Sequence, residues 1–149
     1  MKTKELDLET GIKKIISVLE SVDERPVLAS FYGQPNRGNS RVIDTLIDYF
    51  TAKGREVGRG TGAPIKSCFD RIALPKNDIV LFHCAWLRTI DPKLTSTSED
   101  PNYLAQTILN RELNLNVCVY NPRFYQRPDR KLYDLVICNP GSVRKWKQN

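Results

Sequence analysis

The residues of this sequence whose types and spacing could do chemistry lie in one short segment, Gly33 to Arg41, which reads Gly-Gln-Pro-Asn-Arg-Gly-Asn-Ser-Arg. Four residues separate its two glycines. A glycine loop that joins a strand to a helix can bind phosphate, because backbone N–H groups of the loop and of the first helical turn point at the anion. The segment therefore predicts a phosphate-binding loop. Its candidate residues are Gly33, Asn36, Arg37, Gly38, Asn39, Ser40 and Arg41.

The positive charge available to this loop differs from that of a working phosphate-binding loop. Loops with this glycine spacing place a lysine directly after the second glycine, and this sequence has Asn39 there. An amide donates hydrogen bonds to phosphate but does not neutralise its charge, whereas Arg37 and Arg41 would add positive charge nearby. The alternative interpretation is an ordinary strand-to-helix turn, which needs one glycine but not two at this spacing.

Three further residues are candidates for the same site. His83 is the only histidine of the chain, and it lies toward the carboxyl end of an expected strand. Open α/β sheets bind ligands at that end, so His83 is a candidate catalytic residue; the alternative is a core histidine with satisfied hydrogen bonds. Arg123 and Arg127 lie in an arginine-rich segment, which is either a phosphate clamp or a solvated loop.

The cysteines do not predict a metal centre. No two of them have the two-residue spacing of a zinc site, and three lie in apolar, strand-like runs where cysteine behaves as a small hydrophobic residue. We therefore expect buried free thiols rather than metal ligands or disulfides. The residues concerned are Cys68, Cys84, Cys118 and Cys138.

Strands that alternate with helices must position these candidates. The apolar run 27–32 suits a buried strand and is too short for a helix, and an apolar stripe from Val42 to Phe50 predicts a helix that ends at Gly54. We expect one α/β domain over residues 1–149, a three-layer sandwich with a mainly parallel five-stranded sheet and strand 27–32 at its centre. The expected strands are 27–32, 55–59, 78–86, 115–120 and 133–138, the other expected helices are 6–22 and 101–113, and 58–64 is expected to be a loop.

Composition narrows the class of partner. The hydrophobic content of 40% is that of a globular protein, and 23 basic against 17 acidic residues give a net charge of +6. This excess suits a phosphate-bearing partner, either a small molecule such as a nucleotide or a nucleic acid, although no zinc-finger or RNA-recognition signature supports the nucleic acid. No apolar run is long enough to cross a membrane, and the N-terminal residues lack the apolar core of a secretory signal, so we expect a cytoplasmic protein.

The order of these elements resembles that of the P-loop kinases, especially the uridine kinase and phosphoribulokinase group. The resemblance rests on Arg25-Pro-Val-Leu28 before the loop, on Gly33 to Ser40, on Asp78-Ile-Val-Leu-Phe-His-Cys84, and on the Asn and Gly that follow Tyr133-Asp-Leu-Val-Ile-Cys138. It implies a P-loop kinase-like fold that binds ATP or another nucleotide. Asn39 replaces the loop lysine and His83 replaces an acidic residue, so we expect weak or absent phosphotransferase activity.

The loop is similar to a second kind of loop as well. Flavodoxin-like FMN reductases carry a sequence resembling Gly33-Gln-Pro-Asn-Arg-Gly-Asn-Ser40, which holds the flavin phosphate and needs no lysine. A non-enzymatic interaction module that kept the fold is a further alternative. Strand order separates the first two interpretations. The kinase resemblance requires strand 78–86 to lie between strand 27–32 and strand 55–59, whereas the flavodoxin resemblance places strand 55–59 directly beside 27–32.

Overall fold

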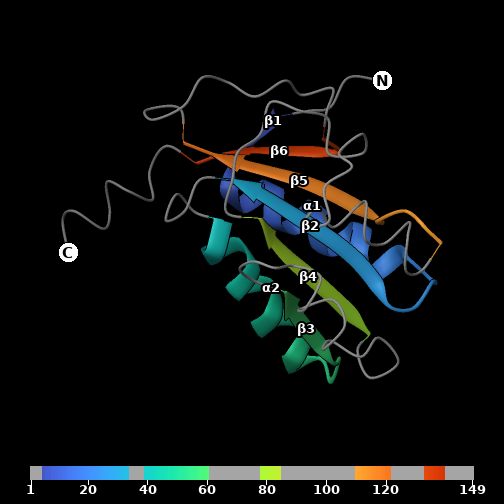
Figure 1. Ribbon diagram of the computed structural model, residues 1–149. Helices are drawn as coiled ribbons and strands as arrows, with labels where there is room; N and C mark the ends of the chain where they lie inside the picture. Colours follow the sequence, from blue (N-terminus) through green and yellow to red (C-terminus); the bar gives the residue numbers. More distant parts are fainter. Residues whose placement is uncertain (1–4, 34–38, 61–77, 85–109, 122–132, 140–149) are drawn as a thin grey trace.

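A parallel sheet forms the centre of the molecule (Figure 1). The computed structural model describes residues 5–33, 39–60, 78–84, 110–121 and 133–139. In this part of the chain every strand pairing is parallel, and the order of the sheet is β1-β6-β5-β2-β4-β3. The elements are β1 Glu5–Leu6, α1 Leu8–Ser21, β2 Val27–Gly33, α2 Asn39–Ala52, β3 Val57–Gly60, β4 Ile79–Cys84, β5 Leu115–Tyr120 and β6 Leu135–Cys138.

The strand order answers the question that the sequence left open. β4 lies between β2 and β3, with Val27 to Tyr32 in register with Ile79 to Cys84, and Val57 to Gly60 in register with Ile79 to Phe82. This is the order that the P-loop resemblance requires, and β2 is an inner strand as expected. The flavodoxin-like alternative is wrong, because β3 does not pair with β2. The finer assignment to the kinase group rests on sequence resemblance alone.

The sheet differs from the expected one at its two edges. Within the described residues it has six strands rather than five, because Glu5 and Leu6 pair with β6 before the first helix begins. The expectation that the helix begins at residue 6 is therefore wrong. At the other edge, β3 confirms that a strand lies near the expected range 55–59, but it runs from Val57 to Gly60, so Gly60 is a strand residue although it was expected to lie in a loop. Pairing with β4 overrides the weak strand preference of glycine here.

Both described helices cover the same face of the sheet. Side chains of α1 and α2 share a core with alternate residues of β2, β4, β5 and β6. The strand side chains of the opposite face are buried too, in a second cluster that includes Leu28, Val80 and Val136. Of the helix 101–113 expected in the third layer, residues 101–109 fall outside the described residues. So do residues 61–64 of the expected loop and the last two residues of the expected strand 78–86. The expectation that the helix extends to residue 113 is wrong, because residues 110–113 are not helical.

Local sequence signals explain where the two helices begin and end. Asp7 caps α1, since its Oδ1 accepts a hydrogen bond of 2.7 Å from the backbone N–H of Thr10. In α2, the predicted apolar stripe is confirmed, because Val42, Ile43, Leu46 and Phe50 are all fully buried. Gly54, two residues after the last residue of α2, has φ +80°, a left-handed conformation that ends helices and suits glycine.

Candidate functional site

The candidate site lies where β2 meets α2, at the carboxyl edge of the sheet. β2 ends at Gly33 and α2 begins at Asn39, so five residues join the strand to the helix. From β2 the chain proceeds to β3 at one edge of the sheet, whereas from β4 and β5 it proceeds toward the other edge. The connections that leave β4 and β5, the two neighbours of β2, thus run in the direction opposite to the connection from β2 to β3. Ligands bind at the carboxyl ends of parallel strands at such topological switch points.

The first turn of α2 gives this edge a positive electrostatic character. In Figure 1, α2 begins beside the arrowheads of β2 and β4. The first N–H groups of a helix have no partners within the helix and lie at the positive end of its dipole. The first turn of α2 contains no acidic residue that would offset this charge. Ser40 is half-buried and Arg41 is exposed, so a hydroxyl and a guanidinium are available at the same helix end.

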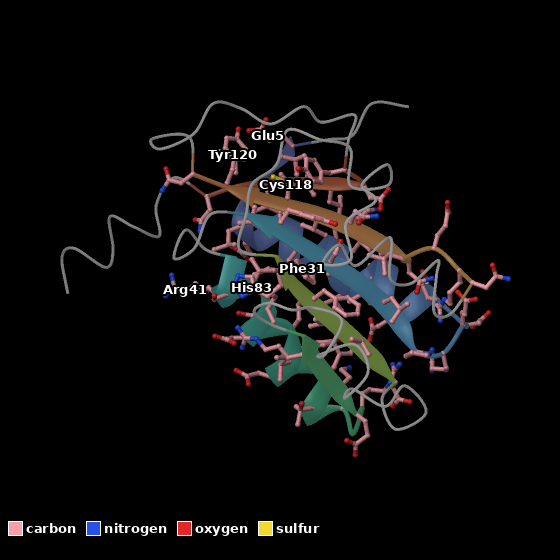
Figure 2. The ribbon with its side chains drawn as sticks, viewed as in Figure 1. Glu5, Phe31, Arg41, His83, Cys118 and Tyr120 are labelled. Carbon is pink, nitrogen blue, oxygen red and sulfur yellow. The ribbon has the colours of Figure 1, made fainter. Side chains whose placement is uncertain are left out.

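His83 lies at the same edge, on the neighbouring strand. It is the penultimate residue of β4 and is in register with Phe31 of β2. Ile79 and Leu81 of β4 belong to the core beneath the two helices. Because strand side chains alternate between faces, His83 shares that face. Figure 2 shows Arg41 and His83 at the end of α2 and β4 where the helix begins. The sequence prediction that His83 lies at the carboxyl end of its strand is confirmed.

The surroundings of His83 favour the neutral form of its imidazole by lowering its pKa. The side chain is half-buried, and its Nε2 is shielded from solvent without a hydrogen-bond partner in the described part of the chain. Burial lowers the pKa of His83 below its ordinary value, the nearby Arg59 guanidinium lowers this pKa further, and the Asp44 carboxylate raises it. The two effects that lower the pKa outweigh the one that raises it.

Arg59 and Asp44 connect β3 to α2 beside this histidine. The Nη1 of Arg59 donates a hydrogen bond of 2.5 Å to the Oδ1 of Asp44. The Asp44 side chain is 60% exposed and that of Arg59 is 32% exposed, so this ion pair contributes little to the free energy of unfolding. Its importance for the site is electrostatic, because it places one cation and one anion near His83.

Two buried asparagines that the sequence analysis did not select as site residues lie farther along the same edge. Asn121 directly follows β5 and is fully buried, and Asn139 directly follows β6 and is 4% exposed. The backbone N–H of Asn139 donates a hydrogen bond of 2.9 Å to the carbonyl oxygen of Tyr120. The available sequence signal was an asparagine immediately after each of two neighbouring strands.

The structure places only part of the set of predicted site residues. At one edge of the sheet it places Gly33 at the end of β2, Ser40 and Arg41 in the first turn of α2, and His83 near the end of β4. The backbone of Asn39 begins α2. The other predicted site residues, Asn36, Arg37, Gly38, Arg123 and Arg127, lie outside the described residues.

The described residues add two observations on metals and membranes. No group of three or more His, Cys, Asp or Glu side chains in the described ranges is arranged to hold a metal ion. Cys118 is a free, buried thiol, as predicted, while the side chain of Cys138 is only half-buried. Neither α1 nor α2 is long and apolar enough to cross a membrane.

Comparisons with known proteins give a structural similarity but no family for this chain. No protein-family model matches the sequence, and no curated protein matches it. Among solved structures, the chain is similar to the signal recognition particle receptor FtsY from Elizabethkingia anophelis, with 13% sequence identity and a TM-score of 0.46. The match covers 76% of this chain and 48% of that one, so this chain spans about half the length of its neighbour. The P-loop-like fold rests on the strand order rather than on this similarity.

Proposed function

We propose that this protein binds the phosphate group of a nucleotide, or of another small phosphate ligand, at the carboxyl end of β2. The observation that carries the proposal is the position of β2 in the parallel sheet. This strand lies at a topological switch point and leads, through a glycine-containing loop, into a helix N-terminus without acidic residues. The loop amides and Ser40 would donate hydrogen bonds to the phosphate oxygens. Arg37 and Arg41 would supply positive charge.

We infer in addition that phosphoryl transfer is weak or absent. Phosphoryl transfer depends on positive charge and a metal ion placed around the transferred group. Asn39 supplies no charge where a lysine would stand, and His83 replaces an acidic residue that would serve magnesium, a cation that prefers oxygen ligands. Arg123 and Arg127 are proposed to supplement the charge, as arginines do in phosphate clamps. If the protein is active, the reaction class is transfer of a phosphoryl group to a small molecule.

Ligand binding tests this proposal directly. Purified protein is titrated with ATP, GTP, FMN and inorganic pyrophosphate, with isothermal calorimetry and thermal unfolding as readouts. A ligand at a hundredfold excess over its Kd stabilises the folded state by about 2.7 kcal/mol. We expect stabilisation by at least one nucleotide and by pyrophosphate. Absence of binding with all four compounds would overturn the proposal and favour an interaction module that lost its ligand, and selective binding of FMN would overturn the nucleotide assignment.

Two substitutions with a matched control locate the ligand. Asn39→Lys should tighten ATP binding about tenfold or more, because a charge-assisted hydrogen bond contributes roughly 1.5–3 kcal/mol. Arg41→Gln should weaken ATP binding. Lys53→Gln removes the same charge from an exposed position just after the opposite end of the same helix, about 18 Å from Arg41 at a rise of 1.5 Å per residue. It should leave the Kd unchanged. Equal effects of Arg41→Gln and Lys53→Gln would show that only net charge matters.

A further inference from the structure

One nitrogen atom of the His83 imidazole makes no hydrogen bond within the described part of the chain. This atom, Nε2, is buried. A buried polar atom without a partner destabilises the structure in which it occurs, so each such atom needs an explanation, and a ligand that completes the hydrogen bond is one. His83 lies on the strand next to β2, at the edge where α2 begins. Nε2 of His83 therefore lacks a hydrogen-bond partner, among the described residues, at the edge of the sheet where we propose that the phosphate binds.

The charges around His83 make its protonation sensitive to a bound anion. Among the described elements packed against β4, β3 contributes the Arg59 guanidinium and α2 contributes the Asp44 carboxylate, while β2 contributes the uncharged Phe31 in register. These two charges are paired with each other, so within the described residues the imidazole shares its one nearby anion, Asp44, with Arg59. A phosphate group at the start of α2 would bring negative charge to this edge, and an opposite charge nearby favours the protonated imidazole.

We propose that His83 couples phosphate binding to proton uptake: when the phosphate group binds at the start of α2, the imidazole takes up one proton from solvent and donates a hydrogen bond from Nε2 to a phosphate oxygen. This inference rests on the proposed function and deepens it. His83 would then be a binding residue for the anion. It would be neither a metal ligand nor a general base in the free protein.

The coupling fixes the direction of the pH dependence. The pKa of His83 is lowered in the free protein, and the anion raises it in the complex. Above both pKa values the imidazole is neutral in either state and the Kd is constant. As the pH falls between the two values, binding takes up a proton and the Kd decreases. Below the pKa of the free protein the Kd is constant again. Each unit by which the ligand raises the pKa gives about a tenfold lower Kd at acid pH.

The single histidine allows a direct measurement. NMR spectra of the imidazole are recorded from about pH 5 to pH 8, the range in which unperturbed histidine titrates, without ligand and with saturating sulfate or pyrophosphate. Sulfate keeps its charge throughout this range. Because the chain has one histidine, the observed titration belongs to His83 without further assignment. We expect a pKa below the ordinary value in the free protein and a higher pKa with either anion.

Affinity measurements test the same coupling independently. The Kd of pyrophosphate is measured over the same pH range for the wild type and for His83→Gln, which keeps a hydrogen-bond donor but cannot take up the proton. Titration of pyrophosphate itself affects both proteins equally, so the difference between the two curves isolates His83. As the pH falls from above the pKa of His83 in the complex to below its pKa in the free protein, we expect the wild type to gain roughly tenfold in affinity relative to the variant. The reason is that the hydrogen bond from Nε2 to the phosphate becomes charge-assisted.

Arg59 offers a second variant that leaves His83 in place. Arg59→Gln removes the cation that lowers the pKa of His83, so the histidine of the free variant should titrate at higher pH. The cation is absent from the complex of this variant too, so the whole pH range over which the Kd falls should lie at higher pH than in the wild type. An unchanged range would contradict the coupling. This comparison keeps the proposal testable even if His83→Gln does not fold.

The possible results separate this inference from the proposed function. If pyrophosphate binds but the pKa of His83 does not change, and the wild type and His83→Gln show the same pH dependence, the inference is overturned and the proposed function stands. If no anion or nucleotide binds at any pH, both are overturned. A ligand that raises the pKa of His83 and binds more tightly at acid pH only when His83 is present supports both.

Discussion

Gly11 is the position at which one added methyl group tests the packing of α1 on the sheet. A Cβ atom at residue 11 would lie 2.6 Å from both Cγ1 and Cδ1 of Ile137 in β6. Carbon atoms in favourable contact are about 3.5–4.0 Å apart, so the overlap is about 1 Å. Ile137 is fully buried and β-branched, which leaves it few alternative rotamers. Gly11→Ala therefore forces either the isoleucine or the helix to move.

The expected cost of Gly11→Ala follows from two opposing contributions. Overpacking of a filled core costs about 1–3 kcal/mol. Alanine in place of glycine inside a helix returns about 1 kcal/mol through helix propensity. The net expectation is a decrease of about 1 kcal/mol in the free energy of unfolding. Urea unfolding followed by circular dichroism measures this difference. Ser17→Ala, at an exposed position of the same helix, is the control and should gain no more than about 0.5 kcal/mol.

A double-mutant cycle identifies the contact responsible. In an Ile137→Ala background, the atoms that the new Cβ would meet are absent, so Gly11→Ala should stabilise the protein by about 1 kcal/mol from propensity alone. The coupling energy between the two substitutions should be about 2 kcal/mol. Equal stabilisation by Gly11→Ala in both backgrounds would refute the argument, because it would show that α1 is not closely packed on β6 at this point.

Three further predictions concern a buried hydrogen bond, a helix cap and a thiol. Ser30 Oγ donates a 2.7 Å hydrogen bond to Asn116 Oδ1 between fully buried side chains, so Ser30→Ala should lower the free energy of unfolding by about 1–3 kcal/mol in urea; an unchanged midpoint would contradict this. The backbone N–H of Thr10 donates a hydrogen bond to the Asp7 carboxylate and lowers its pKa below 3.8. In thermal scans, the charge-dependent part of the stability difference between the wild type and Asp7→Ala should therefore be fully present above pH 3.8 and disappear as the pH falls through the lowered pKa. A stability difference that does not change with pH would exclude a charged cap. Burial raises the pKa of Cys118 to about 12. A variant with Cys118 as its sole cysteine should therefore react with a thiol reagent at about pH 8 only after unfolding. Rapid reaction of the folded variant would show that this strand is open to solvent.

The resemblance drawn from the sequence was correct at the level of the sheet. Short apolar runs identified β2, β4 and β5 because a buried parallel strand must be apolar on both faces, and this requirement is visible without any partner strand. The sequence indicated equally well that a loop joins the end of β2 to a helix that begins near Asn39. A glycine-containing loop between such a run and an amphipathic stripe leaves few alternatives to a strand, a turn and a helix. The candidate residues Gly33, Ser40 and Arg41 followed from this local pattern.

The weak elements could not be found in the same way. Glu5–Leu6 is a strand only because β6 is available beside it, and two residues have no periodicity of their own. The strand expected at 55–59 did not include Gly60, because a glycine-rich segment is typical of a loop. Gly60 becomes a strand residue through its register with Phe82. In both places the partner strand, which is distant in the sequence, decides the conformation.

By itself the sequence determined the inner strands, the apolar stripe of α2 and its termination at Gly54, because burial, helical periodicity and a left-handed glycine are properties of neighbouring residues. Tertiary structure alone decided that β4 separates β2 from β3, that Gly11 faces Ile137, and that His83 lies with Arg59 and Asp44 beside the start of α2. These facts depend on which strands pair, and pairing brings together residues between 15 and 126 positions apart. A pattern read along the chain does not contain that information, because strand order is set by how the helices and connections pack over the whole sheet.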